Sequence, residues 1–233
     1  MTINKTRLLI VEDEAAIRTG LVDVFVFHGF DVDWADNGID GLDKARTGKY
    51  DLILLDVMMP GKNGFDVCNE IRSEDRDQPI ILLTAKSSDE DIIHGLTLGA
   101  DDYVAKPFSV AQLVLRVQAV LRRTKSSAQD GQIELAADFS IDTLNLKGQR
   151  SGNDMSFTRR EMDIIEYLYT HAERPVSREE LLNKVWGYAK DMDIETRTVD
   201  IHIAKLRRKL EPDAAKPAYL VTVRGAGYRL MVN

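Results

Sequence analysis

The sequence predicts two domains, a doubly wound α/β domain followed by an α+β domain. Between Arg7 and Arg123, short Val/Ile/Leu-rich runs alternate five times with segments of helical period. A polar segment at 124–132, TKSSAQDGQ, predicts an interdomain linker. From Ile133 onward, short strands and turns come first, and helices and a hairpin follow. With 233 residues and 44% apolar content, the chain has room for both domains and their cores.

The strands of the first domain are predicted from the apolar runs at 8–11, 52–55, 80–83 and 103–105. These runs lack the alternation of a half-buried strand, which is typical of a parallel sheet with helices on both faces. Helical periodicity predicts helices at 14–28, 37–47, 88–98 and 109–123.

Polar side chains follow these runs where each strand ends. Glu12 and Asp13 follow the first run, Asp56 the second, Thr84 the third and Lys106 the fourth. Because the carboxyl ends of parallel strands share one edge of a sheet, we expect these side chains to converge. Three converging carboxylates repel one another, and a hard divalent ion such as Mg²⁺ relieves that repulsion through oxygen ligands.

In such a site Asp56 can accept a phosphoryl group. A carboxylate oxygen attacks phosphorus, Mg²⁺ and the Lys106 ammonium neutralise the phosphoryl oxygens, and Thr84 donates a hydroxyl to the product. Taken singly, each residue is better explained as a solvated strand end or a surface group, and only the four strand ends together favour the site. An aspartate-based phosphatase is the other alternative, but such enzymes usually carry a general acid two residues beyond the nucleophile, where this chain has Met58.

The second domain begins with short strands predicted at 133–157. Two helix starts follow, because Thr158 to Glu161 and Ser177 to Glu180 each fit a capping box. A basic helix is expected at about 195–210, and residues 219–232 predict a β-hairpin with a glycine-rich tip.

The basic helix stands out in a chain whose net charge is −7, because residues 1–123 carry all of that net charge. Its apolar stripe consists of Val199, Ile203, Leu206 and Leu210. The residues expected to face largely away from the stripe are Arg197, Thr198, Ile201, His202, Lys205 and Lys209. Two helices, a basic helix and a hairpin form the order of a winged helix-turn-helix, which favours double-stranded DNA as partner. A solvated charged face and a protein-binding stripe are the alternatives.

Several function classes are excluded by what the sequence lacks. No apolar run approaches the roughly 18 residues of a membrane span, and the start lacks a signal-peptide pattern, so we expect a cytoplasmic protein with no membrane partner. The single Cys68 cannot form an internal disulfide. It lies on a helical stretch, and we expect it to be a packing residue rather than a nucleophile.

Residues 7–123 resemble the receiver domain of a bacterial two-component response regulator, a flavodoxin-like fold. The matching stretches are LLIVEDE, LILLDVMMPGKNGFDV, PIILLTAK and GADDYVAKPFS. The resemblance implies a cognate histidine kinase that phosphorylates Asp56. It implies these Mg²⁺ ligands: Glu12, Asp13, Asp56 and the Met58 carbonyl. It further implies a phosphate-binding and switch set, Thr84, Tyr103 and Lys106, and a cis bond between Lys106 and Pro107.

Residues 133–232 resemble the DNA-binding domain of the OmpR/PhoB family. The matching stretches are FTRREMDIIEYL, VSREELLNKVWGY, RTVDIHIAKLRRKLE and YLVTVRGAGYRL. By this resemblance, base-edge contacts fall to Thr198, Ile201 and Lys205. Phosphate contacts fall to Trp186, Arg197, His202 and Thr222, and a minor-groove contact to Arg224. Ala204 stands where relatives often have a basic residue, and the loop 187–195 corresponds to the surface for RNA polymerase.

The resemblance also implies an active homodimer held by ion pairs between two receiver domains. The matching residues are Asp101, Asp102, Arg116, Arg122 and Arg123. Ile92 and Gln112 replace a basic and an acidic residue, so one expected pair is absent as a whole. Losing both partners leaves no unpaired charge, which allows a dimer of weaker electrostatic specificity.

These observations predict a receiver domain at 1–123, a linker at 124–132 and a winged-helix domain at 133–233. We expect a phosphorylation-activated transcription regulator rather than an enzyme, which binds half-sites about one helical turn apart. A constitutive DNA-binding protein with a vestigial acidic site and a stand-alone phosphatase are the competing hypotheses.

Overall fold

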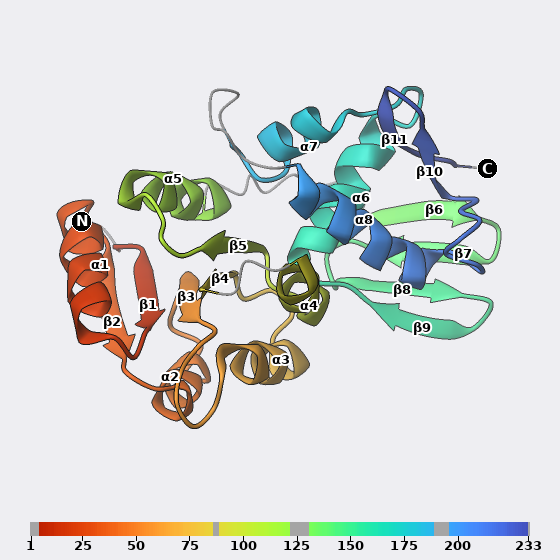
Figure 1. Ribbon diagram of the computed structural model, residues 1–233. Helices are drawn as coiled ribbons and strands as arrows, with labels where there is room; N and C mark the ends of the chain where they lie inside the picture. Colours follow the sequence, from red (N-terminus) through yellow and green to blue (C-terminus); the bar gives the residue numbers. More distant parts are fainter. Residues whose placement is uncertain (1–4, 86–88, 122–130, 189–195, 233) are drawn as a thin grey trace. The chain divides into compact units, whose positions relative to one another are not determined.

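The computed structural model describes residues 5–85, 89–121, 131–188 and 196–232. The chain divides into two compact units, Met1–Leu121 and Arg122–Asn233 (Figure 1). In the described residues, no helix is both long enough and apolar enough to cross a bilayer.

The first unit is a five-stranded parallel sheet in the order β2-β1-β3-β4-β5, which confirms the flavodoxin-like prediction. Its strands are β1 (Arg7–Val11), β2 (Asp31–Ala35), β3 (Leu52–Asp56), β4 (Ile80–Thr84) and β5 (Asp102–Ala105). Its helices are α1 (Ala15–Phe27), α2 (Gly38–Ala45), α3 (Gly64–Glu74), α4 (Asp89–Leu98) and α5 (Val110–Leu121). The strand order reverses between β1 and β3, which is where sheets of this kind bind ligands.

Burial explains the unbroken apolar runs. The central strands β3 and β4 are buried at every position, whereas the edge strands β2 and β5 are partly exposed. On one face of the sheet, Phe25 of α1 and Val117 of α5 pack in the same core as Leu54. On the other face α2 and α4 approach closely, because they present Gly41 to the sheet at Val11 and Gly95 at Leu82. Helices therefore cover both faces (Figure 1).

Within the described residues, the second unit combines an antiparallel sheet, three helices and a hairpin, as predicted for an α+β winged helix-turn-helix. Its sheet contains β6 (Gln132–Ala136), β7 (Phe139–Asp142), β8 (Lys147–Arg150) and β9 (Asn153–Ser156). Its helices are α6 (Arg159–Thr170), α7 (Arg178–Lys184) and α8 (Arg197–Leu210). The hairpin, here called the wing, consists of β10 (Leu220–Val223) and β11 (Gly227–Leu230).

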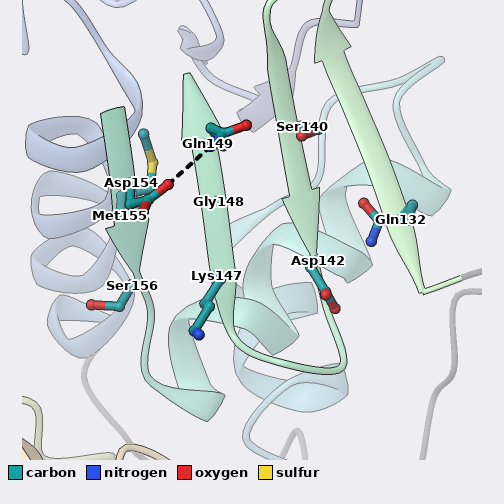
Figure 2. A pocket seen from close by; sticks show the side chains of 9 residues that line it. All are labelled: Gln132, Ser140, Asp142, Lys147, Gly148, Gln149, Asp154, Met155 and Ser156. Carbon is teal, nitrogen blue, oxygen red and sulfur yellow. Dashed lines mark hydrogen bonds between the residues drawn. The ribbon is translucent and has the colours of Figure 1, made fainter. Parts of the chain in front are cut away.

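The sheet of this unit has one apolar and one polar face, as alternation in antiparallel strands requires. Ile133, Phe139 and Ile141 are buried in the core. The opposite face holds a shallow cavity of about 410 Å³, where Gln149 donates to Asp154 over 3.1 Å (Figure 2).

One of the two predicted capping boxes is complete. The Thr158 hydroxyl accepts from the Glu161 amide, and the Glu161 carboxylate accepts from the Thr158 amide. Ser177 caps α7 by accepting from the Glu180 amide. The other hydrogen bond predicted for this box, from the Ser177 amide to the Glu180 carboxylate, is wrong. The Glu180 side chain instead accepts from Tyr167 at 2.7 Å and from Arg174 at 2.6 Å.

Candidate functional site

The four predicted strand ends meet at the carboxyl edge of the parallel sheet. Lys106, directly after β5, donates to Asp56 Oδ2 at the end of β3 over 2.8 Å. The same Nζ donates to both oxygens of Glu12, after β1, over 2.7 and 3.0 Å. Thr84 is the last residue of β4 and is buried. Strand β4 lies between β3, which ends at Asp56, and β5, which precedes Lys106. The parallel topology therefore gathers groups that are up to 94 residues apart in the chain.

Glu12, Asp13 and Asp56 form an acidic cluster, in which one oxygen from each lies within 4.8 Å of the others. Glu12 and Asp56 are buried, whereas Asp13 is exposed. Burial, together with the charge of Asp56, raises the pKa of Glu12 to about 7 against the lowering effect of Lys106. Burial alone would lower the pKa of Lys106, but its bonds to Asp56 and Glu12 outweigh burial and raise it.

This donor set fits Mg²⁺. The ion prefers oxygen ligands, and the three side chains can each turn one carboxylate oxygen toward a common point. Burial and the charge of Asp56 also disfavour the charged form of Glu12, a cost that a divalent ion would offset. The Met58 amide donates to Asp56 Oδ1 over 3.1 Å, which sets the start of the loop after β3 against the carboxylate. The Met58 carbonyl as a further ligand stays a prediction.

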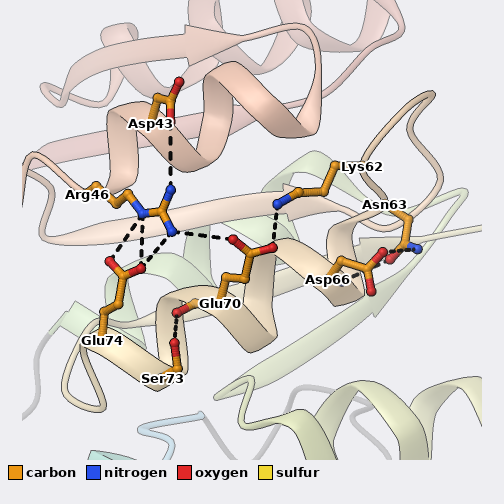
Figure 3. A network of polar contacts seen from close by, with 8 residues as sticks. All are labelled: Asp43, Arg46, Lys62, Asn63, Asp66, Glu70, Ser73 and Glu74. Atoms are coloured by element: carbon orange, nitrogen blue, oxygen red, sulfur yellow. Dashed lines mark hydrogen bonds and ion pairs between the residues drawn. The ribbon is translucent and has the colours of Figure 1, made fainter.

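The loop between β3 and α3 is held in place at two points. At Gly64 a Cβ atom would lie 2.1 Å from the Asp56 carbonyl oxygen, so only glycine allows this approach. Lys62 pairs with Glu70, which also pairs with Arg46 at 3.4 Å (Figure 3). Arg46 reaches Glu74 at 2.7 Å as well and thereby joins α2 to α3.

The predicted switch pair lies on neighbouring strands. Thr84 is buried at the end of β4, and Tyr103 is half-buried on β5. Their movement on phosphorylation stays a prediction. The peptide bond between Lys106 and Pro107 is cis, as predicted.

The predicted dimer residues are largely engaged within their own chain. Asp101 is 1% exposed and accepts from Arg72 at 3.0 Å and from the Ile80 amide at 2.8 Å, so its carboxylate is engaged within its own domain. Its role as a dimer contact stays a prediction. Burial of a carboxylate requires such partners, and here α3 and β4 supply them. Asp102 is buried and accepts from Arg116 at 2.7 Å. Arg122 and Arg123 lie outside the described residues.

The apolar stripe of α8 is confirmed, because Val199, Ile203, Leu206 and Leu210 are all buried. The exposure predicted for the opposite face is only partly correct. Thr198, Ile201 and His202 are 3%, 8% and 1% exposed. The four-residue stripe underestimates the buried surface because side chains of more than one helix pack around α8.

Trp186 and His202 show this packing. The Trp186 ring is fully buried, with the His202 ring edge-on at 5.2 Å and the Arg160 guanidinium at 4.9 Å. His202 Nδ1 also lies 2.9 Å from the Thr198 carbonyl oxygen. Burial lowers the pKa of His202 to about 4, so the ring is neutral near pH 7. Both rings therefore lie in the core of the domain, and the phosphate contacts of Trp186 and His202 stay predictions.

Lys205 does not point toward an open surface either. Its Nζ lies 3.0 Å from Glu161 Oε1, and Lys209 donates to Glu161 Oε2 over 2.6 Å. Burial would raise the pKa of Glu161, but the two ammonium groups outweigh it and lower the pKa. The Lys205 ammonium is thus paired with a buried carboxylate of its own domain, and its base contact stays a prediction.

Exposed cations remain on α8 and on the wing. Arg224 is exposed at the turn of the wing, as predicted, and Thr222 is exposed with its hydroxyl accepting from Arg207 at 2.7 Å. Arg208 is exposed one helical turn beyond the exposed Ala204. Sequence reasoning counted Arg208 only as charge, although its spacing from Ala204 marks it as a group of the same face. Arg197 is half-buried at the first turn of α8.

The loop predicted at 187–195 to meet RNA polymerase lies mostly outside the described residues. Within them, the Tyr188 carbonyl accepts from Asn183 at 2.8 Å, which ties the loop start to α7.

Two family models match the chain. One is the response regulator receiver domain, at residues 8–118, and the other is the C-terminal domain of transcriptional regulatory proteins, at residues 152–230. The fold and the strand-end site therefore define a two-component response regulator with a DNA-binding output domain.

Full-length relatives show the family. The chain is 39% identical over 226 residues to the transcriptional regulatory protein CusR of Escherichia coli, covering 97% of this chain and 98% of CusR. It is 41% identical over 229 residues to a probable transcriptional regulator of Guillardia theta, covering 96% and 90%. The solved structure of DrrB, a Thermotoga maritima OmpR/PhoB homolog, matches with a TM-score of 0.52 and 30% identity over 97% of this chain and 99% of DrrB. A mutant of RitR matches with a TM-score of 0.76 and 27% identity over 98% and 100%. The chain belongs to the OmpR/PhoB family of response regulators.

Proposed function

We propose that Asp56 accepts a phosphoryl group from a histidine kinase and that Glu12, Asp13, Asp56 and the Met58 carbonyl hold Mg²⁺ for this reaction. The observation that carries the proposal is the arrangement around Asp56. Its Oδ2 accepts from Lys106 at 2.8 Å and its Oδ1 from the Met58 amide at 3.1 Å, so the carboxylate is held in one orientation at the sheet edge.

In the reaction, a carboxylate oxygen of Asp56 forms a bond to phosphorus as the phosphorus–nitrogen bond of a phosphohistidine breaks. The kinase imidazole leaves and recovers a proton from solvent. The Lys106 ammonium neutralises charge on the phosphoryl oxygens, and the Thr84 hydroxyl donates to the product phosphate, with Tyr103 following Thr84. When bound, Mg²⁺ adds further neutralisation of these oxygens.

Phosphorylation promotes dimerisation of the receiver domains, and two winged-helix domains then bind half-sites about one helical turn apart. For the dimer we retain the predicted set, which consists of Asp101, Asp102, Arg116, Arg122 and Arg123. For DNA we retain Arg197 and Thr222 as phosphate contacts and Arg224 as the minor-groove contact, and we add Arg208 as a phosphate contact in place of Ala204. The protein acts in the cytoplasm, where the loop at 187–195 contacts RNA polymerase.

The first experiment incubates the full chain with Mg²⁺ and a small acyl phosphate and measures its intact mass. We expect the mass of one added phosphoryl group, and none in Asp56→Asn. Labelling retained in that variant would exclude Asp56 as the acceptor.

A second experiment measures the sedimentation of the chain with and without Mg²⁺ and beryllium fluoride, a mimic of the aspartyl phosphate. A shift from monomer to dimer supports the proposed coupling. Binding of the mimic with no change in mass would contradict it, and DNA affinity independent of the mimic would favour constitutive binding.

A further inference from the structure

Three elements of the DNA-binding domain are joined at one carboxylate. Asp200 on α8 accepts from Arg178 Nε, at the start of α7, over 2.6 Å. The same Oδ1 accepts from the Tyr228 hydroxyl, on β11 of the wing, also over 2.6 Å. Arg178 Nη2 donates in turn to the Tyr228 hydroxyl oxygen over 2.9 Å. We call Arg178, Asp200 and Tyr228 the Asp200 clasp.

The clasp is complete at neutral pH. Burial and the bond to Asp200 raise the pKa of Tyr228 to about 12, so its hydroxyl keeps the proton that it donates. The Arg178 guanidinium also lies 4.8 Å from the centroid of the Tyr228 ring, which adds a cation–π contact. Asp200, the acidic residue of a basic helix, is therefore paired with Arg178 rather than left to repel phosphates.

The backbone of Tyr228 is fixed as well. Its amide and carbonyl exchange hydrogen bonds with Val176 over 2.9 and 2.7 Å, which adds the segment before α7 to the wing. Gly227, at φ +122°, allows this pairing, because a Cβ atom there would lie 2.0 Å from the Val176 carbonyl oxygen. On the other strand of the wing, Arg207 of α8 donates to the Leu220 carbonyl over 2.8 Å.

Arg224 lies on the turn between these two anchored strands, four residues before Tyr228. A two-stranded hairpin has little stability of its own, so its position relative to α8 depends on such anchors. An anchored wing loses less freedom when it meets DNA than a loose one does.

We propose that the Asp200 clasp is a positioning device, which holds the wing so that Arg224 and the α8 residues Arg197 and Arg208 contact one DNA duplex at the same time. This inference rests on the proposed contact between Arg224 and DNA. None of the three clasp residues needs to touch DNA, and Tyr228 is 4% exposed.

The test is a double-mutant cycle between Tyr228→Phe and Arg224→Ala in the full chain. The probe is a duplex selected from a random-sequence pool by the wild-type protein, and affinity is measured at one fixed salt concentration. In the wild-type background, Arg224→Ala is expected to weaken binding by roughly tenfold. In the Tyr228→Phe background, we expect a loss of about threefold or less, because the misplaced wing already lacks most of this contact.

The same domain contains a matched control. Tyr167 donates to Glu180 over 2.7 Å, and Arg174 donates to Glu180 over 2.6 Å, so Tyr167→Phe removes the same hydroxyl from a similar group that contains no residue of the wing. The pKa of Tyr167 is likewise raised to about 12 by burial and its bond to the carboxylate. A merely structural loss of stability would act in both variants, whereas only Tyr228→Phe should change the effect of Arg224→Ala.

Each outcome decides the inference. Equal effects of Arg224→Ala in all three backgrounds overturn the positioning role and leave the proposed DNA contact intact. If Arg224→Ala has no effect in the wild-type background, both the positioning role and the proposed DNA contact of Arg224 are contradicted. If thermal unfolding shows that Tyr228→Phe lowers the folded fraction, the same cycle is run with Asp200→Asn, with the same expected coupling.

Discussion

The ammonium of Lys106 lies 2.8 Å from Asp56 and bonds to both oxygens of Glu12, so one cation serves two buried carboxylates. Each partner follows a different strand, and the parallel sheet alone brings them together. Burial and the charge of Asp56 nevertheless hold the pKa of Glu12 at about 7, above its ordinary value, although Lys106 lowers it. This relationship makes the site sensitive both to loss of Lys106 and to gain of a divalent ion.

Lys106→Met is expected to lower the free energy of unfolding of the receiver domain by about 3 kcal/mol, because it leaves two buried carboxylates without their cation. Mg²⁺ should restore part of the loss. Urea unfolding with and without Mg²⁺ measures both effects. The control is Lys44→Met, whose partner Asp33 at 2.7 Å is only partly buried, with 41% of its side chain exposed, and a loss below about 1 kcal/mol is expected there. Similar losses for the two variants would contradict the prediction.

Gly64→Ala is expected to displace the loop after β3, because the new Cβ atom would lie 2.1 Å from the Asp56 carbonyl oxygen. We predict loss of stability and of phosphorylation, measured by thermal unfolding and intact mass. Gly20→Ala is the matched control, since no atom lies within 4 Å of its Cβ position on α1. That change should stabilise the chain by about 0.5 to 1 kcal/mol. Unchanged phosphorylation of Gly64→Ala would mean that the loop can shift freely.

Glu161→Gln is expected to destabilise the DNA-binding domain by roughly 3 kcal/mol, because Lys205 and Lys209 lose a buried partner. Lys205→Ala should likewise lower stability and leave the ratio of specific to random DNA binding unchanged. Denaturant unfolding and binding to two duplexes measure these effects. A changed ratio in Lys205→Ala would restore Lys205 as a base contact.

The DNA-binding domain is expected to lose stability in mild acid through His202. Burial lowers the pKa of this ring to about 4 in the folded state, against roughly 6.5 when unfolded. Below pH 6.5 the unfolded chain therefore binds the extra proton, and stability falls by about 1.4 kcal/mol per pH unit until pH nears the folded pKa.

Urea unfolding between pH 7 and pH 5 measures this dependence. His202→Gln should be less stable at pH 7 and show a flatter pH profile than the wild type. The corresponding change at the other histidine of the domain, His171→Gln, should leave the profile unchanged. A wild-type slope in His202→Gln would assign the acid sensitivity to other groups.

The strand-end site was predictable because topology alone places it. Apolar runs locate buried parallel strands, and their carboxyl ends share an edge, so Asp56 and Lys106 were assigned without knowledge of any contact. The order of helices and hairpin in the second domain followed in the same way from capping residues and periodicity.

Partners chosen across the fold were not predictable. Glu180 fits a capping box locally, yet Arg174 and Tyr167 bind it more closely than the helix start does. Asp101 matches a position of the family's dimer set, yet Arg72 of α3 binds it inside the domain. Helical period identifies the most apolar side of α8 but not how many elements surround it, which is why the burial of His202 and Thr198 was missed.

The pairing of Lys205 and Lys209 with Glu161 changes what the charge of α8 means for DNA binding. Only cations that lie along the duplex displace condensed counterions, and their number sets how steeply affinity falls with salt. Two of the five basic residues of α8 neutralise the protein's own interior instead. On binding DNA, the helix should therefore displace fewer counterions than its five basic residues suggest. The affinity of this regulator for DNA should then fall less steeply with salt than that of a protein whose recognition helix places all its cations on phosphates.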